Sequence, residues 1–232
     1  MLQELILILT SANGEILVLK KVSKTTWPID RYEPLITCFK NFNESFFFNP
    51  IQAEILDKLR QCGVGQRPVI FVGHSMGGLI AKKMILQAQA EQDHDLVDNT
   101  KGMVFFSTPH LGSSVAKLNS ATKFFFFPST EVNDLEENSH QLVDLNANFK
   151  NLAKEKEDLR IISFGEALTT PMFGIDMTFV SPESSNLGIG EHYQIEANHL
   201  NVCKPDSKES IIYKKFIELV MDVIDDNVLC NY

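Results

Sequence analysis

The feature that most constrains the fold of this chain is a strand-like run that leads through a glycine-rich motif into a helix-like run. Pro68–Gly73 is a continuous apolar segment typical of a buried parallel strand. It ends in Gly73-His74-Ser75-Met76-Gly77, and an apolar segment that predicts a helix follows as far as Ala90. A serine on a sharp turn between strand and helix is the arrangement of a nucleophile elbow. Gly73 and Gly77 stand where such a turn leaves no room for side chains.

Strand-like and helix-like segments alternate along the rest of the chain. This alternation predicts an α/β fold, with a mostly parallel sheet that helices cover on both faces. Asn13-Gly14 favours a hairpin between the first two strands, and Glu209 completes a capping box for a last helix that starts near Asp206. The predicted strands are Leu5–Thr10, Glu15–Leu19, Leu35–Phe39, Gly102–Ser107, Leu159–Gly165 and Met177–Val180. Further helices are predicted over Ile51–Leu59, which ends at Gly63, and in the last segment, where Ile211, Ile212, Phe216, Leu219, Val220 and Val223 are expected to be buried.

Length and composition narrow the class of protein. A chain of 232 residues with 44% hydrophobic and 22% charged residues is expected to form one globular domain over residues 1–232. The net charge of −9 disfavours nucleic acid or an anionic membrane surface as a partner. No secretory signal is recognised in residues 1–10, and no apolar run is long enough to predict a transmembrane helix. The widely spaced Cys38, Cys62, Cys203 and Cys230 predict neither a disulfide framework nor a metal site.

A serine nucleophile needs a base within hydrogen-bonding reach. Enzymes built on this elbow carry serine, acid and histidine in that order along the chain. His199, on a loop just before the terminal helix, fits the last position, and His192 is the alternative. His110 follows a predicted strand and is expected near the same sheet edge, whereas His74, His94 and His140 fit the role of base less well.

The acid is expected after a strand that lies between Ser75 and His199. Glu166 directly follows the predicted strand Leu159–Gly165, and Asp176 is the alternative. A carboxylate there would orient the imidazole and stabilise its charged form. The backbone N–H of Met76, at the start of the helix, is expected to donate to an oxyanion. The aromatic run Phe124, Phe125, Phe126 and Phe127 is either core packing or the lining of an apolar substrate cleft.

Four segments in order, GHSMGGLIAKKMILQA, GMVFFSTPHLGS, SFGEAL and NHLNVCKP, resemble the serine-active-site-containing lipase-like proteins. These are α/β-hydrolases related to lipases that deacylate glycosylphosphatidylinositol inositol. The resemblance covers a family-like catalytic part, residues 66–232. It implies Ser75 as nucleophile, His199 as base, Glu166 as acid, a lipid ester as substrate and no cofactor. Because the family is associated with phosphatidylglycerol remodelling at mitochondrion–endoplasmic-reticulum contacts and with cholesterol handling, the resemblance also implies an intracellular location and membrane association.

Residues 1–65 depart from the family pattern. Family members carry a His-Gly pair after an early strand, where a backbone N–H completes the oxyanion hole. Here Leu5–Thr10 runs into Ser11-Ala12-Asn13-Gly14 instead, although Trp27-Pro28 resembles a family Trp-Pro. We therefore expect an altered or truncated amino-terminal part, with early strands that do not complete the family sheet.

Three functions fit these residues. The first is a serine hydrolase or acyltransferase that acts on a lipid ester. The second is a catalytically impaired lipid-binding or scaffolding module that retains a vestigial elbow, which the missing His-Gly favours. The third is a peptidase, which uses the same three residue types.

Overall fold

The computed structural model describes the backbone of three early strands, β1 (Leu5–Thr10), β2 (Ile16–Lys21) and β3 (Glu33–Ile36). It describes residues 56–57, 59–61, 63–112, 140–172 and 174–225 in full, and the backbone alone of residues 226–229. Phe124–Phe127, the turn after β1 and Trp27-Pro28 lie outside the described residues.

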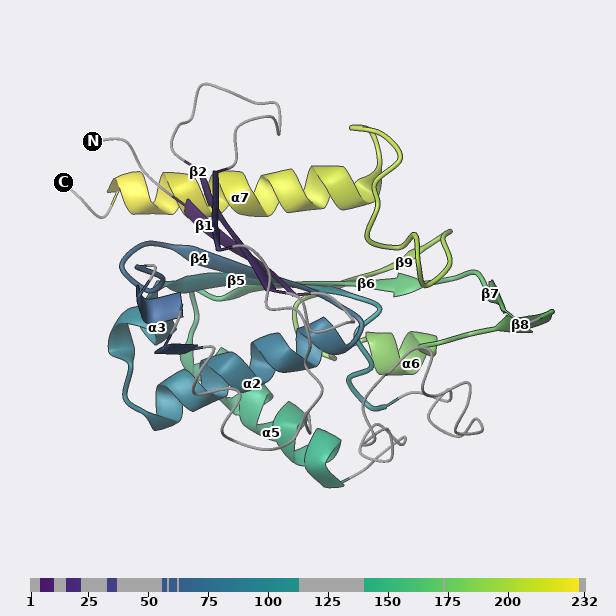
Figure 1. Cartoon of the computed structure of the whole chain (residues 1–232), viewed down its shortest axis with the longest axis horizontal. Helices are drawn as coiled ribbons and strands as arrows, with labels where there is room; N and C mark the ends of the chain where they lie inside the picture. Colours follow the sequence, from purple (N-terminus) through teal and green to yellow (C-terminus); the bar gives the residue numbers. More distant parts are fainter. Residues whose placement is uncertain are drawn as a thin grey trace.

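A seven-stranded sheet forms the centre of the molecule (Figure 1). Its order is β3-β2-β1-β4-β5-β6-β9, with β4 at Val69–His74, β5 at Thr100–Phe106, β6 at Arg160–Glu166 and β9 at Glu191–Ile195. The five strands from β1 to β9 in this order pair in parallel, and β2 and β3 add in antiparallel fashion. The predicted mostly parallel sheet and the predicted hairpin are both present, and the early strands extend this same sheet.

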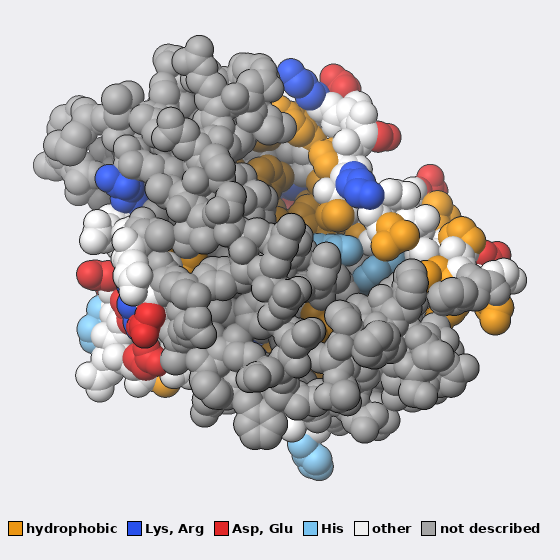
Figure 2. Space-filling view, viewed as in Figure 1, with side chains coloured by type: hydrophobic (Ala, Val, Ile, Leu, Met, Phe, Trp, Pro, Cys, Tyr) orange, Lys and Arg blue, Asp and Glu red, His pale blue; other side chains and the backbone are white. Residues whose placement is uncertain are grey.

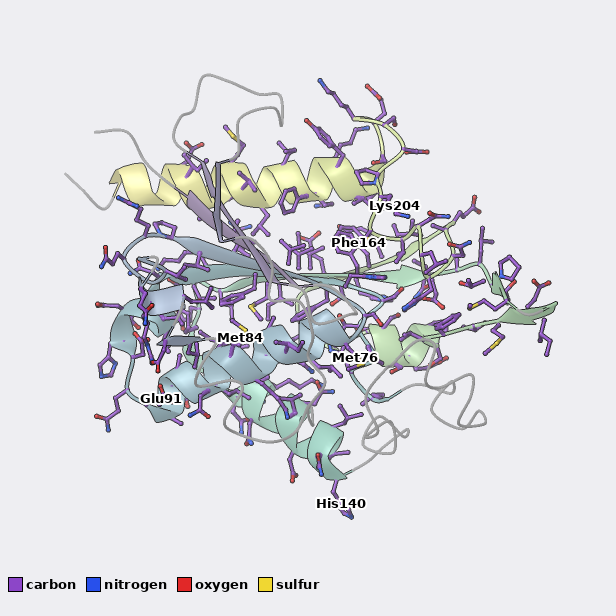
Figure 3. All side chains as sticks on the ribbon, in the orientation of Figure 1. Met76, Met84, Glu91, His140, Phe164 and Lys204 are labelled. Carbon is purple, nitrogen blue, oxygen red and sulfur yellow. The ribbon has the colours of Figure 1, made fainter. Side chains whose placement is uncertain are left out.

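Helices cover both faces of the sheet, as predicted. One face carries α2 (Met76–Ala90), α3 (His94–Asn99) and α5 (His140–Glu155), and the other carries α7 (Ile211–Leu229) (Figure 1). Figure 3 shows Met84 and Phe164 on opposite sides of the sheet, each within its own hydrophobic cluster. Because both faces are buried, the central strands consist of nearly continuous apolar residues.

The structure differs from the sequence predictions in several details. No strand spans Met177–Val180. Instead, β7 (Thr170–Met172) and β8 (Ile175–Met177) pair as a separate hairpin, and the short α6 (Pro182–Ser185) follows. Strand β9 was not predicted, because its polar sequence suits a partly exposed edge position.

The last helix begins at Ile211 rather than near Asp206, so the predicted capping box does not form. Ser210 caps this helix instead, and its Oγ accepts the N–H of Tyr213 at 3.3 Å. As a consequence Ile211, which we expected to be buried, is 41% exposed at the first turn.

Candidate active site

Ser75 lies on the sharp turn between β4 and α2 that the motif predicts. Its backbone has φ 55° and ψ −129°, a conformation rare for a residue with a side chain, and the residue is only 2% exposed. The turn is held by the N–H of Ser75, which donates to the carbonyl of Phe106 at 2.8 Å. Met76 begins the helix directly below (Figure 3). Strain of this kind is concentrated at functional sites.

Glycines make the close approach of β4 and α2 geometrically feasible. A Cβ on Gly73 would lie 2.4 Å from the Cα of Gly78 and 2.9 Å from the carbonyl carbon of Gly77. A Cβ on Gly78 would lie 2.0 Å from Oγ1 of Thr108. Gly78, which the motif itself does not include, is therefore as crowded as Gly73.

His199 faces Ser75 from the loop that precedes the terminal helix. Its Nε2 lies 3.1 Å from Oγ of Ser75, and the residue is 4% exposed. Its ring stacks on Phe179 with a centroid distance of 4.7 Å and an interplanar angle of 17°. The backbone N–H of His199 donates to Oγ1 of Thr170 at 3.1 Å. Backbone and ring are therefore both fixed.

Glu166 ends β6 and contacts the other ring nitrogen of His199. The distance from its Oε2 to Nδ1 of His199 is 2.5 Å, and its Oε1 accepts the N–H groups of Phe179 at 2.7 Å and Val180 at 3.2 Å. Burial raises the pKa of this carboxyl, but the hydrogen bond and charge of His199 and the two N–H donors outweigh burial and hold the pKa below its usual 4.5. Glu166 is therefore ionised at neutral pH, so Nδ1 carries the proton and Nε2 is free to accept one from Ser75.

The alternative candidates lie elsewhere. Asp176 is exposed on β8, paired opposite Pro171, and has no contact with His199. His192 lies on β9 with its Nε2 3.3 Å from Oγ of Ser185. His94 and His140 are exposed at the starts of α3 and α5, respectively.

His110 lies near the same sheet edge, as expected, but it is buried. The centroids of its ring and the Phe105 ring are 4.9 Å apart, and the two rings are perpendicular. Neither of its ring nitrogens has a hydrogen-bond partner. Burial lowers its pKa well below the usual value. It makes no contact with the serine.

The expected oxyanion donor Met76 directly follows Ser75 in the chain. Met76 stands at the amino terminus of α2, where backbone N–H groups are free of helical partners. Strand β1 runs parallel to β4 with Thr10 opposite Gly73, so the chain leaves β1 at the edge where Ser75 lies. The turn after β1, where the family carries His-Gly, and the aromatic run Phe124–Phe127 lie outside the described residues.

The sequence interpretation missed the groups that support His199 and Glu166. Thr170, Phe179 and Val180 come from the β7–β8 hairpin and the segment after it. Phe179 and Val180 looked like strand residues because they are apolar and buried. Nothing in the local pattern shows that their N–H groups bind a carboxylate 13 and 14 residues earlier.

Other features of the described residues do not add a site. No group of three His, Cys, Asp or Glu side chains among them is placed to hold a metal ion. A surface pocket between β6, β9 and α7 lies at the amino-terminal ends of these strands, opposite the edge of Ser75. Charged residues in its lining form ion pairs, such as Arg160 with Asp222 at 2.9 Å and Lys215 with Glu191 at 3.0 Å. Among all the residues that the structure describes, no helix is both long and apolar enough to cross a membrane.

The sheet order, the elbow after β4 and the helices on both faces define an α/β-hydrolase fold. Residues 49–134 match the family described as "Putative serine esterase (DUF676)". The chain is also similar to proteins named SERAC1. It is 43% identical over 175 residues to that of Danio rerio and 38% identical over 173 residues to that of Homo sapiens. These matches confirm the family resemblance predicted from the sequence.

Each of these alignments covers 74% of this chain and 26% of the relative, so the chain spans about a quarter of the length of the curated relatives it matches. Similar solved structures include phospholipase PlaB from Legionella pneumophila, with a TM-score of 0.44 and 19% identity over 59% of this chain and 32% of that one. Another is lipase BlEst2 from Bacillus licheniformis, with a TM-score of 0.44 and 15% identity over 73% of this chain and 71% of that one.

Proposed function

We propose that this chain is a serine esterase in which Ser75 is the nucleophile, His199 the general base and Glu166 the residue that orients His199. The observation that carries the proposal is the unbroken chain of contacts from Oγ of Ser75 to Nε2 of His199, and from Nδ1 to the carboxylate of Glu166. A buried histidine that only forms structural hydrogen bonds does not require a serine on a strained turn. The strained backbone of Ser75 together with these contacts therefore favours catalysis.

In the proposed reaction, Oγ of Ser75 attacks the ester carbonyl carbon while Nε2 of His199 takes its proton. The N–H of Met76 donates to the oxyanion of the tetrahedral intermediate. Collapse of this intermediate breaks the bond to the alkoxy group, which leaves as an alcohol with the proton from Nε2. The acyl group then remains on Ser75. Water, or a second alcohol in the case of acyl transfer, resolves the acyl-enzyme by the same steps in reverse order.

Glu166 stabilises the imidazolium that forms on His199 in each half of the reaction. The carboxylate is 2% exposed, so its attraction to the imidazolium is screened less than at a surface. Two backbone N–H donors keep the carboxylate in place without neutralising it. This support favours a buried glutamate in the role that aspartate has in other triads.

We further propose that the substrate is an ester with an apolar acyl chain. Large apolar side chains are exposed beside the loop that carries His199: Leu168 is 51% and Leu200 49% exposed. Leu168 donates its N–H to the carbonyl of Ala197 at 3.2 Å, which places it against the loop that carries His199. Figure 2 shows hydrophobic side chains next to histidine side chains on the face of the molecule in view.

Turnover of p-nitrophenyl esters of increasing acyl length tests this function. Ser75→Ala should abolish turnover at every length, while Ser163→Ala, which removes another buried hydroxyl, should leave it intact. Leu168→Asn and Leu200→Asn should raise KM for long chains and leave short-chain turnover unchanged. Val143→Asn, which changes a side chain 45% exposed on α5, is the matched surface control. Activity that survives in Ser75→Ala would refute the role of Ser75 as nucleophile. Equal losses at all acyl lengths in the two leucine variants would refute a role of Leu168 and Leu200 in binding the acyl chain.

A further inference from the structure

His74 has no role in the reaction scheme above, yet it contacts the proposed base. It is the last residue of β4, immediately before Ser75, and its Nε2 lies 2.9 Å from the backbone oxygen of His199. The centroids of the two imidazole rings are 5.0 Å apart with an interplanar angle of 41°. Because a carbonyl oxygen can only accept, Nε2 of His74 carries the proton and donates it to this bond.

The backbone of His199 is thus held on both sides by side chains from different elements. Thr170 on β7 accepts its N–H at 3.1 Å, and His74 on β4 donates to its C=O at 2.9 Å. The loop itself is anchored nearby, because Val202 is 0% exposed and belongs to the hydrophobic cluster that α7 covers. The two hydrogen bonds act on the backbone of His199 itself, at the residue whose ring contacts Ser75.

We propose that His74 is a positioning residue: its Nε2–H anchors the carbonyl of His199 and so keeps the imidazole within reach of Oγ of Ser75. The proposal deepens, and rests on, the proposed esterase function. It makes the nucleophile and its base parts of one unit, because the residue that anchors the base is adjacent to the nucleophile in the chain. A shift at the elbow is then transmitted to His199 through His74.

The charge state of His74 suits this role. Burial, followed by the positive charge that His199 can carry, lowers the pKa of His74 to about 4. His74 is therefore neutral at the pH at which a serine esterase works. A neutral donor anchors His199 without repelling the imidazolium that forms on it during acyl transfer.

Two substitutions of His74 with side chains of similar length distinguish the effect of the hydrogen bond from the effect of filling the space. Glutamine at position 74 (His74→Gln) keeps an N–H donor at the reach of Nε2, whereas His74→Met fills the space without a donor. The first readout is the rate constant for labelling of Ser75 by a fluorophosphonate. The second is the low-field proton resonance of the short Nδ1–H bond between His199 and Glu166.

We expect His74→Met to slow labelling by about tenfold to hundredfold, as a small misplacement of the base does. The same variant should shift or broaden the low-field resonance, and His74→Gln should remain close to the wild-type chain in both readouts. Wild-type rates and resonances in both variants would overturn the positioning role of His74 and leave the esterase proposal standing. Equal losses in His74→Gln and His74→Met would also overturn the positioning role. If the wild-type chain is not labelled, the esterase proposal fails, and the resonances alone decide whether His74 holds His199.

Discussion

Lys82 is the basis of a prediction about stability, because it is a fully buried lysine on the helix that begins at the elbow. It is 0% exposed between α2 and α5, where its Nζ donates to Oδ1 of Asn146 at 2.7 Å. The Nζ also lies 6.0 Å from the centroid of the Phe149 ring. Burial, aided by the nearby charge of Lys150, lowers the pKa of Lys82 from its usual 10.5 to about 7.

This shift makes the free energy of unfolding depend on pH. Between the two pKa values Lys82 is neutral in the folded chain and charged in the unfolded chain, so the unfolded state binds more protons. Stability therefore rises with pH in this window, by about 1.4 kcal/mol per pH unit from this group. With pKa values of 10.5 and about 7, the gain between pH 8 and pH 10 is about 2.5 kcal/mol.

Urea unfolding of the wild-type chain and Lys82→Met at pH 8 and pH 10 measures this gain. Other lysines and tyrosines titrate in both proteins and cancel in the difference. Relative to the variant, the wild-type chain should gain about 2.5 kcal/mol over this interval. Lys154→Met, which replaces an exposed lysine on α5, is the matched control and should show no such change. A wild-type-to-variant difference that is the same at both pH values would show that Lys82 stays charged in the folded chain, contrary to this prediction.

The remaining predictions concern the elbow and the acid. Glu166→Gln should lower kcat on a short-chain ester by about 10⁴-fold, because an amide no longer selects the productive His199 tautomer; a loss smaller than tenfold would contradict the role of Glu166. Since the lowered pKa of Glu166 contributes stability that is present above pH 4.5 and lost as the pH falls further, thermal melts from pH 6 to pH 3 should fall more steeply for the wild-type chain than for Glu166→Gln. Parallel curves would argue against that linkage. Gly78→Ala places a Cβ 2.0 Å from Oγ1 of Thr108, so we expect the free energy of unfolding measured in urea to fall by about 1–3 kcal/mol. An unchanged urea midpoint would show that the elbow tolerates a side chain at this position.

The sequence was most informative where chemistry depends on local pattern. The crowding around Ser75, the acid after a buried strand and the histidine before the last helix each leave a short recognisable signature. The structure brings these three side chains together, with Glu166 rather than Asp176 at His199. Asp176 lies ten residues beyond Glu166 on an exposed hairpin, and the local sequence pattern does not distinguish the two candidates.

Long-range and edge features were not predictable in the same way. Strand β9 has the sequence Glu-His-Tyr-Gln-Ile, whose polarity suits a sheet edge but does not distinguish it from a loop. The contact of His74 with His199 joins residues 125 apart, so no periodicity announces it. The predicted start of the last helix was wrong because two cap signals compete in this segment. Asp206 with Glu209 matches a capping box, and Ser210 matches a single capping residue equally well.

Reaction of the folded chain with a fluorophosphonate, read by intact mass and peptide mapping, tests whether Ser75 is the nucleophile. We expect one adduct per chain, located on Ser75, with none on Ser75→Ala and strongly slowed labelling on His199→Gln. A folded wild-type chain that forms no adduct, or an adduct that persists in Ser75→Ala, would contradict this role of Ser75.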